Sequence, residues 1–165
     1  MNYFDKQEAI DSTLLNQLND QLNWFNGMTA NTRMSEIDYS CTDKKGRLTH
    51  VELKQRKGTL DTYVNKYKTV LIEPGKIYAT TRIMESGYTN EEQRLYINFV
   101  DDGVIIFNLN DIKRMEFYPN HKQINYGKHK YEFEDRFGLF VQDAMIYKYA
   151  EDGRLIKCPY QNLIR

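Results

Sequence analysis

The sequence predicts an α/β (α+β) fold in one domain, with a mixed sheet that follows an amphipathic N-terminal helix. Apolar residues recur every three or four positions in residues 5–26, which is typical of a helix lying on a core. Apolar and polar residues alternate in 37–42 and 50–56, as in strands with one buried face. The short apolar run 68–73 then predicts a buried central strand.

The N-terminal helix is expected to end at Gly27, which is placed to cap it. Glu8 lies four residues after Phe4 and seven before Leu15, on or beside the apolar stripe. A carboxylate there has two interpretations. It either reaches a partner on the sheet, or it belongs to the first turn of the helix and points to solvent, where the helix dipole favours it.

The next two strands are joined by the sequence "DKKG", which suits a type I turn with Gly46 in the left-handed conformation. This turn pairs Asp43 with Arg47. Counting outward along both strands places Asp38 directly opposite Glu52.

Two carboxylates and an ammonium are therefore expected on one face of this hairpin, because Lys54 lies two residues beyond Glu52. Asp38 opposite Glu52 is destabilising through like-charge repulsion unless a cation lies between them. This arrangement is the first physical indication of a metal site. The alternative is an ordinary solvated hairpin face in which Lys54 neutralises one carboxylate.

Pro74 is expected to open a second helix over residues 74–86. Strands at 93–100 and 103–110 follow, joined by a tight turn at Asp101-Asp102-Gly103. The predicted core spans about residues 5–110.

Residues 111–165 are predicted to form a β-rich C-terminal extension of the same sheet, with a helical turn at 136–143. Within this extension, the stretch 118–133 interleaves Lys and His with Tyr and Phe. Such a stretch can hold nucleic acid by charge and stacking, or it can be a solvated hairpin.

The composition is that of a globular protein, with 41% hydrophobic and 28% charged residues. The 23 basic and 23 acidic residues give no net charge, so global charge does not indicate nucleic-acid binding. No apolar run approaches the roughly 20 residues that span a bilayer, and no signal peptide is evident, so we expect a cytoplasmic protein with no membrane contact. Cys41 and Cys158 are expected to be ordinary thiols.

These features together resemble the PD-(D/E)xK nuclease superfamily, which has the restriction-endonuclease-like fold. The resemblance rests on Asp38 in one strand and Glu52-Leu53-Lys54 within "VELKQR" in the next, set in an αβββαβ order of elements. It covers roughly residues 5–100. Ile37 stands where many members of the superfamily have a proline.

The resemblance implies a metal-dependent nuclease that hydrolyses phosphodiester bonds. Asp38, Glu52 and the backbone carbonyl of Leu53 would bind Mg²⁺, with Mn²⁺ as a substitute, and Glu8 would add a ligand. Lys54 would orient or activate the attacking water and stabilise charge in the transition state.

Further expectations concern the substrate. His50, Arg56 and Lys76 are weaker candidates for phosphate contacts. The expected partner is nucleic acid, with DNA favoured over RNA, and cleavage of both strands of a duplex would suit a homodimer. The alternative function is a catalytically inactive module of the same fold that binds nucleic acid or a protein partner.

Overall fold

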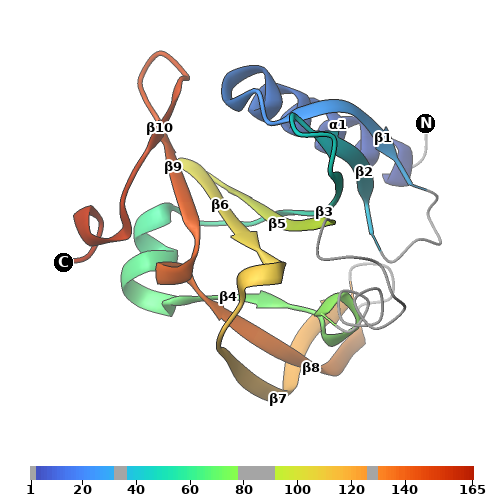
Figure 1. Cartoon of the computed structure of the whole chain (residues 1–165). Helices are drawn as coiled ribbons and strands as arrows, with labels where there is room; N and C mark the ends of the chain where they lie inside the picture. Colours follow the sequence, from blue (N-terminus) through green and yellow to red (C-terminus); the bar gives the residue numbers. More distant parts are fainter. Residues whose placement is uncertain (1–2, 32–36, 78–91, 126–129) are drawn as a thin grey trace.

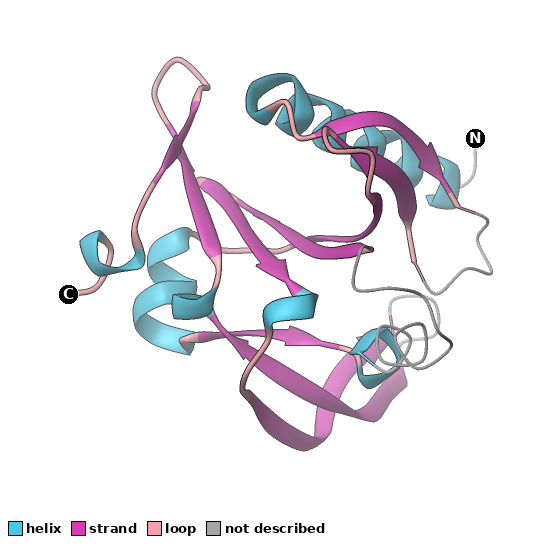
Figure 2. Cartoon of the chain, viewed as in Figure 1, coloured by secondary structure: helices cyan, strands magenta, loops and turns pink. Residues whose placement is uncertain are grey.

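The computed structural model describes residues 3–31, 37–77, 92–125 and 130–165 of the chain (Figure 1). It contains one long helix, short helical turns and ten strands in these ranges (Figure 2). The long helix and the strands are α1 (Tyr3–Leu22), β1 (Phe25–Ala30), β2 (Tyr39–Asp43), β3 (Leu48–Gln55), β4 (Thr69–Ile72), β5 (Gln93–Val100), β6 (Gly103–Asn108), β7 (Met115–Asn125), β8 (Lys130–Phe140), β9 (Met145–Tyr149) and β10 (Leu155–Lys157). The short helical turns are η1 (Thr62–Tyr67), η2 (Leu109–Asp111), η3 (Val141–Asp143) and η4 (Tyr160–Asn162).

The strands form two sheets. The larger sheet has seven strands in the order β1-β2-β3-β5-β6-β9-β10, and it is mixed because β3 and β5 run parallel while the other neighbours run antiparallel. The smaller sheet has the order β4-β8-β7 and is antiparallel. The predicted α/β class with a mixed sheet is therefore confirmed. No helix in the described ranges is long and apolar enough to cross a membrane.

The larger sheet has a hydrophobic core on each face. On one face, Val51 and Leu53 of β3 pack in a cluster with Leu15 and Leu18 of α1. On the other face, Tyr96 of β5 packs in a cluster with residues of β4, β8 and η1. Because side chains alternate along a strand, Glu52 and Lys54 point away from α1 and toward the smaller sheet.

The N-terminal helix ends earlier than predicted. Its last residue is Leu22, and Asn23 adopts the left-handed conformation (φ 51°) with its amide donating to the Asn19 carbonyl at 2.7 Å. The Asn19 side chain then bonds the backbone of Phe25, where β1 begins. Gly27 is therefore not a helix cap but a positive-φ residue within β1, where the pairing with β2 shifts register.

Predictions about the later strands need correction. The apolar run 68–73 does form a buried strand, β4, but at the edge of the smaller sheet rather than at the centre of the larger one. Among the described C-terminal strands only β9 and β10 extend the larger sheet, since β7 and β8 pair with each other and with β4. The predicted helical turn near 136–143 is limited to the 3₁₀ turn η3, because β8 continues to Phe140.

The second predicted helix begins where Pro74 indicated. Residues 74–77 are helical, and residues 78–86 of that prediction lie outside the described part of the chain. The strands predicted at 93–100 and 103–110 are confirmed as β5 and β6, although β6 ends at Asn108.

Candidate active site

The hairpin of β2 and β3 has the predicted register. Tyr39 pairs with Val51, and the Asp43 amide donates to the Arg47 carbonyl at 2.8 Å, with Gly46 at a φ of 79°. The same count places Asp38 opposite Glu52, one residue beyond the paired segment.

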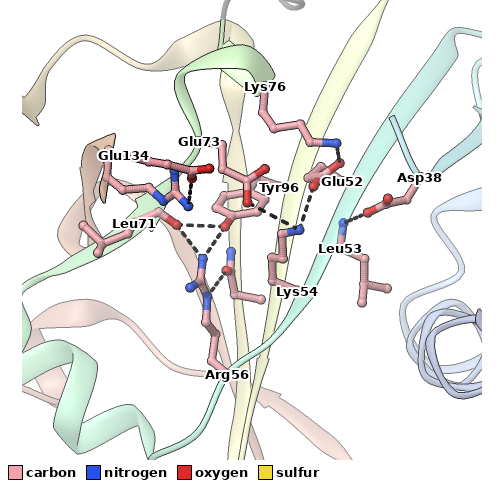
Figure 3. Close-up of polar contacts among 12 residues, drawn as sticks. Asp38, Glu52, Leu53, Lys54, Arg56, Leu71, Glu73, Lys76, Tyr96 and Glu134 are labelled. Atoms are coloured by element: carbon pink, nitrogen blue, oxygen red, sulfur yellow. Dashed lines mark hydrogen bonds and ion pairs between the residues drawn. The ribbon is translucent and has the colours of Figure 1, made fainter. Parts of the chain in front are cut away.

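Asp38 is half-buried and is fixed to the neighbouring strand. Its Oδ2 accepts a hydrogen bond from the Leu53 amide at 2.8 Å (Figure 3). This bond replaces the backbone pairing that would continue the ladder, so the carboxylate lies at the edge of β3. The N–H and C=O of one strand residue project to the same side, which directs the Leu53 carbonyl toward Asp38 as well.

Glu52 is a buried carboxylate, 5% exposed. Its oxygens form ion pairs with Lys54 at 3.3 Å and with Lys76 at 2.9 Å. Burial chiefly, and the Asp38 carboxylate to a smaller extent, raise the pKa of Glu52 to about 7, although both ammonium groups oppose the shift.

Lys54 lies between two carboxylates. Its Nζ is 3.3 Å from Glu52 Oε1 and 4.0 Å from Glu73 Oε1 (Figure 3). Burial acts to lower the pKa of Lys54, but the charges of Glu52 and Glu73 outweigh it and raise that pKa above its ordinary value. Lys54 is therefore a protonated donor at neutral pH and not a proton acceptor.

Lys76 approaches the same carboxylate from the helical segment 74–77. Its amide donates to the Glu73 carbonyl at 3.0 Å, and its side chain extends to Glu52. The predicted phosphate contact is thus replaced in this structure by an ion pair with Glu52.

His50 and Arg56 lie on the same face of β3 as Glu52 and Lys54, but both contact neighbouring protein groups. The ring nitrogens of His50 lie 3.1 Å from Glu92 Oε2 and 3.3 Å from Ser40 Oγ. Arg56 donates to the Asn98 side chain at 3.1 Å, and also to the Leu71 carbonyl and the Tyr96 hydroxyl.

Glu8 does not join this group. Its side chain is exposed, and α1 packs on the face of the sheet opposite to Glu52 and Lys54. The described ranges contain no cluster of three or more His, Cys, Asp or Glu side chains that could hold one ion. The expected ligand role of Glu8 therefore has no support in the described contacts.

The chemistry of the remaining donors suits Mg²⁺. Asp38 and Glu52 supply hard carboxylate oxygens, and Leu53 supplies a carbonyl. Mg²⁺ in proteins is commonly held by one or two carboxylates, with water and substrate phosphate completing its octahedron. The burial of Glu52 is the observation that best fits a cation, since a buried carboxylate is costly unless positive charge lies beside it, as Lys54 and Lys76 do here.

Sequence reasoning did not identify three neighbours of this group. Glu73 and Tyr96 lie beside Lys54, and Arg136 of β8 lines the same cleft. Glu73 has a local signal, because an acidic residue ends an apolar strand just before Pro74. Tyr96 and Arg136 have none, because they approach β3 through pairings between distant segments.

No protein-family model matches the chain, and no curated protein matches it significantly.

Proposed function

We propose that this protein is a Mg²⁺-dependent nuclease of the PD-(D/E)xK type that hydrolyses phosphodiester bonds, with DNA favoured as the substrate. The observation that carries the proposal is the arrangement of Asp38, Glu52 and Lys54. The hairpin register sets the two carboxylates side by side, and Lys54 forms an ion pair with the buried one, Glu52.

The order of elements supports the proposal. A helix precedes three antiparallel strands, β1 to β3, and the next strand of the sheet, β5, runs parallel to β3 after a crossover that contains the helical segment 74–77. Apart from η1 and β4, which also lie between β3 and β5, this order resembles the αβββαβ core of the restriction-endonuclease-like fold. The sequence-based prediction counted the segment 68–73 as the third strand before the second helix. In the structure the three strands before the crossover are β1, β2 and β3, and the segment 68–73 lies within the crossover.

The side chains have distinct roles in this mechanism. Asp38, Glu52 and the Leu53 carbonyl would hold Mg²⁺, which supplies Lewis-acid stabilisation of charge on the phosphate. The protonated Lys54 would donate hydrogen bonds to the attacking water and to the phosphate oxygens, where negative charge develops. The Asp38 bond to the Leu53 amide fixes one carboxylate in advance.

The proposal is tested by incubating the full chain with single-stranded, duplex and branched DNA and with RNA, with Mg²⁺ or with EDTA. Cleavage that requires the metal supports a nuclease, and intact substrates under all conditions contradict it. Mn²⁺ in place of Mg²⁺ is expected to sustain cleavage.

One observation favours the alternative, a catalytically inactive module that binds nucleic acid or a protein partner. Lys54 and Lys76 both form ion pairs with Glu52, so this carboxylate already has positive charge beside it. A divalent ion that binds Glu52 therefore competes with the Lys76 ammonium.

This competition gives a prediction. Lys76→Gln should strengthen Mg²⁺ binding about tenfold, because it removes a positive charge 2.9 Å from a ligand oxygen. Isothermal titration calorimetry measures the change, and the exposed Lys148→Gln on β9 is the control for loss of a surface charge. If Lys76→Gln binds Mg²⁺ with the same affinity as wild type, Lys76 does not compete with the metal ion for Glu52.

A further inference from the structure

A cleft of about 220 Å³ lies between the two sheets, next to the proposed catalytic group. Its walls come from distant segments of the chain: β3 and β5 on one side, and β4, β7 and β8 on the other. The residues that line it are Lys54, Arg56, Tyr96, Leu71, Glu73, His121 and Arg136.

The lining of the cleft has more positive than negative side chains, although the chain has no net charge. Lys54, Arg56 and Arg136 carry positive charge, Glu73 carries the one negative charge among the described lining residues, and His121 adds an imidazole ring that can donate a hydrogen bond. Lys54 and Arg136 are offset by their partners Glu52 and Glu134. Arg56, which forms no ion pair within the described ranges, is therefore the lining cation best placed to attract an anion.

Two of these cations are held in place. Arg56 is fixed through its Nε to Asn98 and through one terminal nitrogen to β4 and β5, whereas its other terminal nitrogen makes no hydrogen bond with any described residue. Arg136 is 6% exposed, and its guanidinium pairs with Glu134 at 2.5 Å (Figure 3). A fixed planar guanidinium with a spare N–H edge, such as that of Arg56, suits phosphate oxygens.

The wall opposite β3 contributes an accessible group. The His121 side chain on β7 is exposed and makes no hydrogen bond or ion pair within the described ranges, although it lines the cleft. It belongs to the stretch 118–133, in which basic and aromatic residues interleave. A ligand in the cleft would therefore contact both the catalytic strand and the C-terminal hairpin.

We propose that this cleft binds a phosphate of a single-stranded segment of the substrate, with Arg56 and His121 as its ligands. The inference rests on the proposed nuclease function for the identity of that substrate. Lys54 lines the cleft and also contacts Glu52, so a strand bound here has its next phosphate close to the carboxylates. The volume of about 220 Å³ admits a phosphate with its sugar but not a base pair as well.

The test is binding of a fluorescent single-stranded oligothymidylate in EDTA, measured by anisotropy, so that no cleavage is required. His121→Ala should weaken binding severalfold and His121→Glu at least tenfold, with unchanged melting temperatures because the side chain is exposed. Arg56→Lys should also weaken binding, since lysine lacks the planar edge. Arg154→Gln is the control, because Arg154 is 76% exposed and lies outside the cleft.

Competition identifies the group that is bound. Thymidine 5′-monophosphate should displace the oligonucleotide, and thymidine should not. Binding that is absent, or equal in wild type, His121→Glu and Arg56→Lys, would overturn the cleft proposal. If the wild type cleaves DNA in a metal-dependent way but these variants do not affect binding, the cleft proposal is wrong and the nuclease proposal stands. If the variants weaken binding but the wild type does not cleave, the nuclease proposal is wrong and the cleft still binds a nucleic-acid phosphate.

Discussion

Lys54→Met is expected to reduce the rate of DNA hydrolysis by about 10² to 10³-fold without weakening Mg²⁺ binding. The side chain is an ammonium donor at neutral pH, because the charges of Glu52 and Glu73 raise its pKa. Loss of one preorganised donor to developing charge typically costs this much in rate. Methionine preserves the apolar stem, so folding should be retained.

Asp38→Asn and Glu52→Gln are expected to act differently from Lys54→Met. Each removes one carboxylate from the ion, so Mg²⁺ affinity should fall about tenfold or more, and activity should fall with it at limiting metal. The asparagine side chain in Asp38→Asn would retain an oxygen that can accept from the Leu53 amide, which limits structural damage. Calorimetric titration separates binding from rate.

Lys148→Met is the matched control for loss of a lysine, because Lys148 is exposed on β9. A full rate of cleavage in Lys54→Met would remove Lys54 from the mechanism. Equal Mg²⁺ affinity in wild type, Asp38→Asn and Glu52→Gln would show that the hairpin holds no ion and would leave these residues as a structural ion-pair group.

The sequence predicts the part of the candidate site that depends on neighbouring segments of the chain. The turn "DKKG" fixes how the two strands pair, since a one-residue slip would turn every side chain to the opposite face. Asp38 and Glu52 are brought together by that turn alone. The strands β5 and β6 are joined as simply, at Asp101-Asp102-Gly103.

The parts that the sequence did not predict depend on distant segments. The composition of residues 68–73 indicates burial but does not say which sheet buries them, and β4 pairs with β8, far along the chain. Tyr96 and Arg136 approach Lys54 only through such pairings. The early end of α1 has a local cause, because Asn23 can adopt the left-handed conformation that the prediction assigned to Gly27.

Glu52→Gln is expected to change the stability of the metal-free protein in a way that depends on pH. Relative to wild type, the variant should be more stable at alkaline pH than at acidic pH. The pKa of Glu52 is raised from 4.5 to about 7 in the folded protein, so folding favours its protonated form. The stability that the folded protein gains from the protonated Glu52 carboxyl is present in full below pH 4.5 and is lost as pH rises through 7. The loss is on the order of 3 kcal/mol in the free energy of unfolding.

Urea denaturation of wild type and Glu52→Gln in EDTA, from about pH 4.5 to about pH 8.5, measures this effect across the range in which the carboxyl titrates. The stability of the variant relative to wild type should rise with pH over this range, because glutamine carries no charge to bury. Glu151→Gln, at an exposed position, should follow the wild-type curve. Parallel curves for wild type and Glu52→Gln would mean that Lys54 and Lys76 fully compensate the buried carboxylate. In that case burial of the ionised Glu52 carboxylate costs no free energy that a metal ion could recover. The burial of Glu52 would then not strengthen the binding of a cation beside Asp38.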